Sequence, residues 1–102
     1  MLSFRTYDLA VRFYRAVVPL RLPSHLRSQM LRAASSVPLN LQEGSARGTF
    51  KDRVHFYRIA YASFREAKAV LDLVDLIPSA EFLDLADHLG ACLYKLVNQG
   101  PR

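Results

Sequence analysis

The sequence predicts an all-α protein, built as one up-down-up-down antiparallel four-helix bundle over residues 1–102. Three observations predict it. Apolar residues recur at spacings of three and four in four successive stretches, which is the period of a helix face. Proline or glycine separates each stretch from the next, and no stretch alternates apolar and polar residues as a half-buried strand does. The connections are short, so consecutive helices should lie antiparallel within a single domain.

The first two helices are expected on either side of a proline-bounded segment, residues 19–23. The first helix spans about residues 5–18. Ser24 can accept a hydrogen bond from the first free backbone amides, so we expect it to cap the second helix. Pro38 lies inside the apolar pattern of this helix and lacks a backbone N–H, so a kink or a break is expected there. The second helix should end near Gly44.

The third and fourth helices are bounded by recognisable start and stop signals. Thr49 and Asp52 have the spacing of a capping box, and Pro78 should end the third helix. Apolar residues occupy two adjoining faces of this helix, which indicates that both faces are buried. Ser79 is expected to cap the fourth helix, and the Gly-Pro pair at residues 100–101 should end it.

The composition excludes several classes of protein. Hydrophobic residues make up 51% of the chain and charged residues 23%, which excludes a disordered polar chain. The single cysteine, Cys92, excludes a disulfide scaffold and a cysteine-based zinc site. No apolar run approaches the roughly 18–20 residues of a membrane span, and the first residues lack the apolar region of a signal peptide. We therefore expect a cytoplasmic protein that does not contact membranes.

The net charge of +5 is unevenly distributed along the chain. Residues 1–65 hold 11 Lys and Arg against 3 Asp and Glu, a net charge of +8, whereas residues 66–102 have a net charge of −3. A strongly basic half suggests a polyanionic partner, most simply nucleic acid. The alternative is that the two halves attract each other within the fold or between subunits.

The basic residues include two groups with helical spacing. Lys51, Arg58 and Arg65 are spaced by seven and should share one face of the third helix. Arg5, Arg12 and Arg15 form a similar stripe around Asp8 on the first helix. An ordinary solvated helix face is the alternative interpretation. The residues expected to contact nucleic acid are Arg12, Arg15, Arg32, Arg47, Lys51, Arg53, Arg58 and Arg65.

Polar residues in the middle of the chain are expected to form a structural network, in which a carboxylate pairs with arginine on a facing helix and fixes the helix register. Its members are Arg32, Asn40, Glu43, Ser63 and Glu66. A catalytic role would need paired acids in a cleft, so we expect no enzyme and no cofactor. Asp84 and His88 have the i, i+4 spacing of metal ligands, but we expect them to be solvated and to bind no metal.

Aromatic side chains are candidates for stacking on single-stranded bases. Five of them fall on core-type positions, which favours packing in the interior. These are Tyr7, Tyr14, Tyr57, Tyr61 and Phe64. Phe13 and Phe56 lie off the main apolar stripes and are expected at a subunit interface instead.

Two segments carry a family resemblance. They are LRAASSVPLNLQEG at residues 31–44 and FYRIAYASFRE at residues 56–66. Both resemble the four-helix bundle proteins named for the intervening sequences of bacterial large-subunit ribosomal RNA genes. One branch of that family is the accessory variability determinant of diversity-generating retroelements. The chain departs from the usual family pattern at Ala62-Ser63, where the family usually has Gly-Ser.

The resemblance implies a four-helix bundle that assembles into a basic, five-fold ring. For the retroelement branch it implies binding of RNA or DNA and of the element's reverse transcriptase, with a role in complementary-DNA synthesis. The short chain and the VPLN segment favour this branch. The alternative is an oligomeric intervening-sequence protein that acts as a structural or protein-interaction module without nucleic-acid function.

Overall fold

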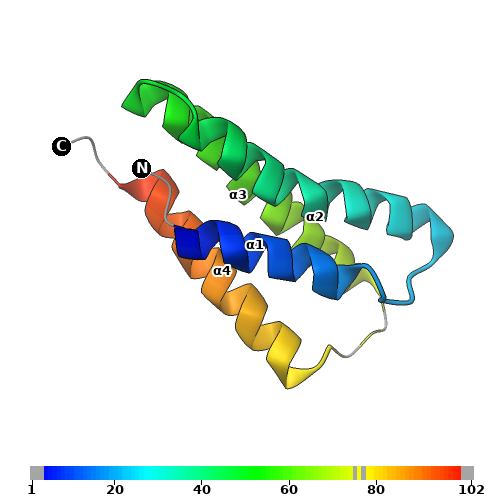
Figure 1. The fold of residues 1–102 in the computed structure, drawn as a ribbon. Helices are drawn as coiled ribbons and strands as arrows, with labels where there is room; N and C mark the ends of the chain where they lie inside the picture. The colour runs from blue at the N-terminus through cyan, green and yellow to red at the C-terminus, as the bar shows by residue number, and fades with distance from the viewer. Residues whose placement is uncertain (1–3, 75, 77, 100–102) are drawn as a thin grey trace.

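The computed structural model describes residues 4–74, 76 and 78–99, and there the chain forms four α-helices and no strand. Consecutive helices run in opposite directions (Figure 1). The four are α1 (Phe4–Val17), α2 (Ser24–Ser45), α3 (Phe50–Leu73) and α4 (Ala80–Asn98). The predicted all-α fold of four helices is therefore confirmed. Among the described residues, no helix combines the length and the apolar character needed to span a membrane.

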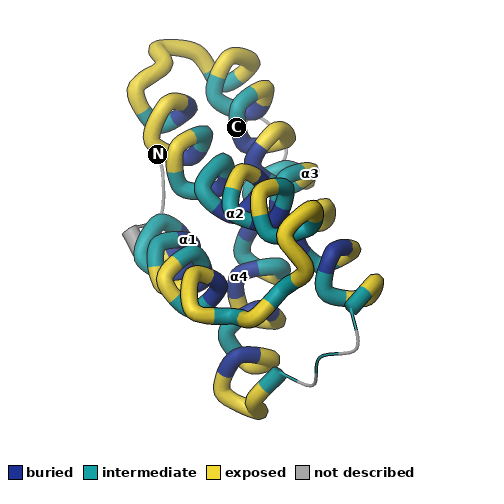
Figure 2. The backbone as a smooth tube through the Cα atoms, turned by 90° about the vertical axis from the view of Figure 1, so that its right-hand side faces the viewer, coloured by how far each residue is buried: buried dark blue, intermediate teal, exposed yellow. Residues whose placement is uncertain are grey.

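The helices pack in a closed cycle, in which each one contacts two others. α1 packs against α2 and α4, and α3 packs against the same two helices. The most extensive interface joins α2 and α3, the two longest helices. Within the described part of the chain the backbones of α1 and α3 do not approach each other, so the two helices lie diagonally across the bundle and meet through core side chains such as Phe13 and Phe64. Buried positions follow the inner sides of the helices (Figure 2).

Two of the predicted helix caps are present. The Thr49 hydroxyl accepts a hydrogen bond from the Asp52 amide at 3.2 Å, and the Ser79 hydroxyl accepts one from the Phe82 amide at 3.1 Å. Each hydroxyl satisfies one of the backbone donors that the first helical turn leaves free. α3 and α4 therefore begin where the sequence indicates.

The predicted cap at Ser24 is wrong. Ser24 is the first residue of α2, and Pro23 occupies the cap position without a side-chain hydrogen bond to the helix. The Pro23 carbonyl accepts from the amides of Leu26 and Arg27, both at 2.9 Å. Since backbone carbonyls receive these first amides, the helix begins without a hydroxyl cap, and the fixed φ of proline suits this position.

Two other expectations about helix limits also differ from the structure. α2 continues through Pro38 without a break. α3 ends at Leu73, before Pro78, because Val74 already has an extended backbone with φ −106° and ψ 149°. Because this end lies five residues before Pro78, the proline is not the residue that stops the helix. The expected helix end at residues 100–101 lies outside the described residues.

The core corrects the assignment of Phe13 to a subunit interface. Phe13 is fully buried, and its ring centroid lies 5.4 Å from that of Phe64 and 5.6 Å from that of Phe82. The buried face of α1 is displaced by about one residue from the predicted stripe, because α2 and α4 cover it from both sides. Tyr7 and Tyr14 are consequently only half-buried at its margin.

Candidate nucleic-acid interface

The basic stripe on α3 is exposed to solvent. Lys51, Arg58 and Arg65 are all exposed, because seven residues correspond to nearly two helical turns and keep them on one side. None of them forms an ion pair with a carboxylate of the described chain. The two ion pairs that occur in residues 4–74, 76 and 78–99 join other arginines to acids four residues away on the surface. The α3 stripe is therefore left with its positive charge uncompensated by direct contacts.

The basic stripe on α1 lies elsewhere on the molecule. Arg12 and Arg15 are exposed, and the Arg12 Nε atom lies 3.0 Å from an Asp8 carboxylate oxygen. Because α1 and α3 occupy opposite corners, one protomer does not bring the two stripes together. A continuous basic belt would need α1 of one subunit beside α3 of another.

The turn between α2 and α3 holds two further arginines in defined positions. The Arg47 guanidinium lies over the Phe56 ring, 4.7 Å from its centroid, and forms an ion pair with Glu43. Arg53 donates a hydrogen bond to the Arg47 carbonyl at 3.3 Å. Arg32, one helix away on α2, is exposed and takes part in no ion pair with a described residue. Arg32 and Arg47 are thus exposed, whereas Arg53 is half-buried.

Part of the predicted polar network joins α2 to α3. The hydroxyls of Ser36 and Ser63 are 2.8 Å apart, and the Asn40 amide donates to both the hydroxyl and the carbonyl of Ser36 at 2.9 Å. All three residues are half-buried. A short hydrogen-bonded group of this kind links the two helices at one position, and Asn40 and Ser63 both belong to it.

The charged members of the predicted network make different contacts from those expected. Glu66 accepts a hydrogen bond from the Gln29 amide at 3.1 Å, whereas Glu43 pairs with Arg47 one turn away. No carboxylate–arginine pair joins facing helices in the described residues. Arginine at i+4 reaches Glu43 without crossing to another helix.

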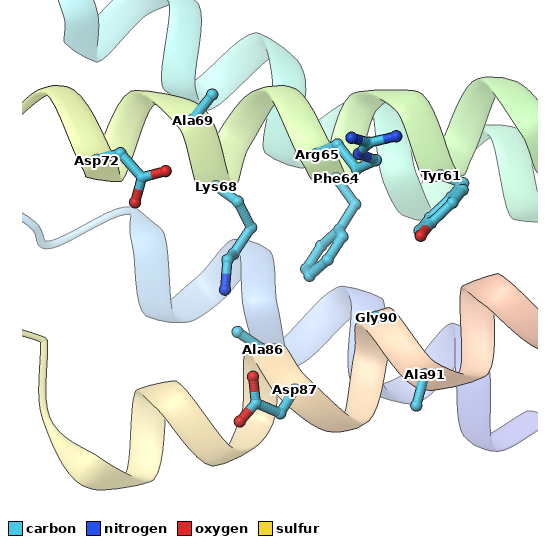
Figure 3. A pocket seen from close by; sticks show the side chains of 10 residues that line it. All are labelled: Tyr61, Phe64, Arg65, Lys68, Ala69, Asp72, Ala86, Asp87, Gly90 and Ala91. Atoms are coloured by element: carbon cyan, nitrogen blue, oxygen red, sulfur yellow. The ribbon is translucent and has the colours of Figure 1, made fainter.

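Sequence reasoning missed a groove between α3 and α4. It has a volume of about 420 Å³. In Figure 3, Tyr61, Phe64 and Lys68 extend from α3 toward α4. The residues that line it are Tyr61, Phe64, Arg65, Lys68, Ala69, Asp72, Ala86, Asp87, Gly90 and Ala91. The groove therefore connects the basic stripe, through Arg65, to the acidic helix α4.

A glycine keeps the two walls of this groove close. A Cβ atom at Gly90 would lie 3.0 Å from the Phe64 ring, which is closer than ordinary packing allows. Ala86 precedes Gly90 by one turn, and both line the groove. A pair of small residues at i, i+4 facing an aromatic residue is the sequence signal that would have indicated this close approach.

The side chain of Tyr57 on α3, which lies beside Gly44 of α2, has a perturbed pKa. Burial raises the pKa of the Tyr57 hydroxyl above its usual value, and the positive charge of Arg53 opposes this shift. The hydroxyl is buried and has no hydrogen-bond partner among residues 4–74, 76 and 78–99. In the described residues, no three His, Cys, Asp or Glu side chains gather as a metal site would require.

Comparison with known proteins identifies the family of this chain. Searches of curated proteins and of solved structures gave no match to this chain. The family model described as 23S rRNA-intervening sequence protein matches residues 4–97, which extend from the start of α1 to the last turn of α4. Because the match covers nearly the whole sequence, the chain belongs to the 23S rRNA-intervening sequence protein family.

Proposed function

We propose that this protein is a non-enzymatic accessory factor that binds RNA or RNA/DNA through the basic side of α3. The proposal rests on the exposure of three basic side chains of α3 and on their lack of carboxylate partners in the described chain. Lys51, Arg58 and Arg65 are exposed, aligned along one helix and free of carboxylate partners within the described chain. A solvent-exposed row of unpaired cations suits a phosphate backbone.

The expected chemistry is electrostatic. Each arginine presents a planar fork that can hold a phosphate with two parallel hydrogen bonds, while Lys51 contributes a point charge. Contacts of this kind release condensed counterions, so affinity falls steeply with salt and depends little on sequence. The basic stripe accordingly accounts for affinity rather than for selection of one RNA.

The proposal extends to assembly and to a partner. We propose that the protein forms a homopentameric ring and assists the reverse transcriptase of a diversity-generating retroelement. Support comes from the family resemblance and from large apolar side chains left on the surface, among which Leu39 is 67% exposed and Leu73 is 72% exposed. Such exposed apolar side chains are suited to contact with another chain. A ring would also allow Arg12 and Arg15 to lie beside the α3 stripe of a neighbour.

The first experiment measures RNA binding by fluorescence anisotropy in a salt titration. The Arg58→Glu/Arg65→Glu variant should lose binding at physiological salt and keep its assembly state by light scattering. The matched control is Arg21→Glu/Lys95→Glu, which changes the net charge equally at two exposed basic residues outside both stripes. Unchanged affinity in the Arg58→Glu/Arg65→Glu variant contradicts the proposal.

Arg12→Glu/Arg15→Glu then tests the ring. If α1 of one subunit lies beside α3 of the next, this variant should weaken RNA binding as well. The polymerase partnership is tested separately, by the yield of complementary DNA from the purified retroelement reverse transcriptase with and without this protein. No change in yield would remove that partnership and leave RNA binding in place.

A second candidate function is an oligomeric interaction module without nucleic-acid contact. It is favoured by α4, where Glu81, Asp84 and Asp87 are exposed and form no ion pair in the described chain. These acids would meet the basic half of a neighbouring subunit. High salt should then dissociate the assembly, whereas an assembly held by apolar contacts should persist.

A further inference from the structure

The groove between α3 and α4 combines features that the basic stripe lacks. Flat aromatic side chains, small residues, cations and carboxylates all line one hollow of about 420 Å³. We propose that this groove holds an unpaired guanine base of a single-stranded RNA segment whose phosphates lie on the α3 stripe. The inference rests on the proposed RNA binding, and it adds a preference for one base and for single strands.

The shape of the groove suits a flat ring. Phe64 is almost completely buried against Gly90 and closes the bottom of the groove, while Ala69 on α3 and Ala91 on α4 leave its mouth without bulky side chains. Tyr61 is half-buried at one end. Aromatic side chains beside an open slot are the arrangement on which unpaired bases stack.

Tyr61 is held in place by two neighbours. Its ring centroid lies 6.4 Å from that of Tyr94 in an edge-to-face arrangement, and the Arg65 guanidinium lies 6.0 Å from the Tyr61 centroid. Tyr94 is 56% exposed, which is unusual for a tyrosine that serves only packing. The two rings and the guanidinium present a stable platform at the end of the groove where the basic stripe reaches it.

The polar side chains that line the groove are of the chemical types that recognise guanine. Lys68 extends from α3 toward α4, where Asp87 lies, and Asp72 stands one turn further along α3 (Figure 3). Neither aspartate forms an ion pair in the described chain, so its oxygens are free to accept. Guanine offers two N–H groups on its Watson–Crick edge to a carboxylate, and its O6 and N7 accept from lysine.

The other bases fit less well. Adenine places the acceptor N1 where guanine has a donor, and a carboxylate has no proton to give it. A base in a duplex keeps its Watson–Crick edge occupied by its partner, so only an unpaired base can enter. Arg58 lies two turns from Arg65 along α3, about 10 Å away, and so continues the path of the strand outside the groove.

The test uses fluorescein-labelled RNA octamers of uridine with a single central guanosine, inosine or adenosine, measured by anisotropy at constant salt. The guanosine octamer should bind about tenfold more tightly than the adenosine octamer. Inosine, which lacks the 2-amino group, should fall between them. Annealing the guanosine octamer to its complement should remove the preference.

Two kinds of variant locate the preference. Asp87→Asn and Asp72→Asn keep the shape of the groove and replace a carboxylate with an amide, and the one that faces the base should reduce the guanosine preference to about twofold or less. Ala91→Leu fills the groove from an exposed position, and it should lower guanosine binding to the adenosine level. Ala62→Leu is the matched control, because Ala62 is exposed on α3 outside the groove.

The outcomes separate this inference from the proposed function. Salt-dependent binding of all octamers with equal affinity overturns the guanine site and leaves the basic interface standing. No binding of any RNA at low salt overturns both. A guanosine preference that survives both aspartate variants, or that Ala62→Leu reduces as much as Ala91→Leu, also overturns the assignment to this groove.

Discussion

At the residue scale, Gly44 controls how closely α2 approaches α3. A Cβ atom there would lie 2.8 Å from the Tyr57 ring and 3.0 Å from the Phe56 Cβ atom. Gly44→Ala should therefore destabilise the protein by about 1–3 kcal/mol, although alanine favours the helix by about 1 kcal/mol. Urea unfolding measures the difference. Gly48→Ala is the control, since no atom lies within 4 Å of its added Cβ, and it should be neutral or slightly stabilising.

Tyr57 gives the protein a specific response to alkaline pH. Because burial raises its pKa in the folded state, the unfolded chain releases this proton first as the pH rises. Its contribution to folding is therefore intact below about pH 10, the ordinary pKa of tyrosine, and is progressively lost above it. Tyr57→Phe should reduce the loss of stability between neutral and strongly alkaline pH.

Tyr57→Phe should also change the stability of the protein at neutral pH. The Tyr57 hydroxyl is buried without a partner in the described part of the chain, so its removal should change the free energy of unfolding by no more than about 1 kcal/mol, in the stabilising direction. Urea unfolding of the wild type, Tyr57→Phe and Tyr14→Phe at both pH values checks this. An alkaline loss as large in Tyr57→Phe as in Tyr14→Phe would assign the effect to other groups.

At the element scale, the starts of α3 and α4 depend on hydroxyl caps. Thr49→Ala and Ser79→Ala each remove the acceptor for one free amide, so each should cost about 0.5–2 kcal/mol. Ser24→Ala is the matched control, because Ser24 makes no cap hydrogen bond and should cost much less. Thermal unfolding followed by circular dichroism measures all three. Equal losses in the three variants would contradict the assigned caps.

Some features of the helices could be predicted from nearby residues, whereas others depend on packing between helices. Thr49 and Ser79 were predictable because a cap involves groups only three residues apart. The limits of α2 were harder, since Pro38 costs the helix a hydrogen bond, yet α2 stays continuous through its packing on α3. Local rules report what a segment prefers, whereas the packing of one helix against another decides whether that preference prevails.

At the scale of the whole molecule, we expect the charged side chains to contribute little to folding stability and much to binding at the surface. Both ion pairs of the described chain are local and exposed, so they add little to stability. Raising the salt from about 50 mM to about 1 M should change the free energy of unfolding by less than about 1 kcal/mol. RNA affinity should fall steeply over the same range. Parallel unfolding and anisotropy titrations compare the two, and a steep loss of stability with salt would contradict this separation.

The candidate site was only partly predictable for a related reason. Spacing by seven placed Lys51, Arg58 and Arg65 on one exposed side of α3, because helix geometry alone determines which residues share a face. The same spacing could not reveal that α1 lies at the opposite corner from α3. Nor could it reveal the groove, whose walls come from residues about 25 positions apart.

The sequence by itself determined the four helices, two of their caps, the basic side of α3 and the family, since each depends on residues close together in the chain. Tertiary structure decided that Phe13 is buried, that Ser36 and Ser63 join α2 to α3, and that Glu43 pairs within its own turn. It also brought Tyr61, Lys68 and Asp87 to one groove. The physical reason is that periodicity states which side chains a helix presents together, whereas the rotation and spacing of neighbouring helices decide what each face meets.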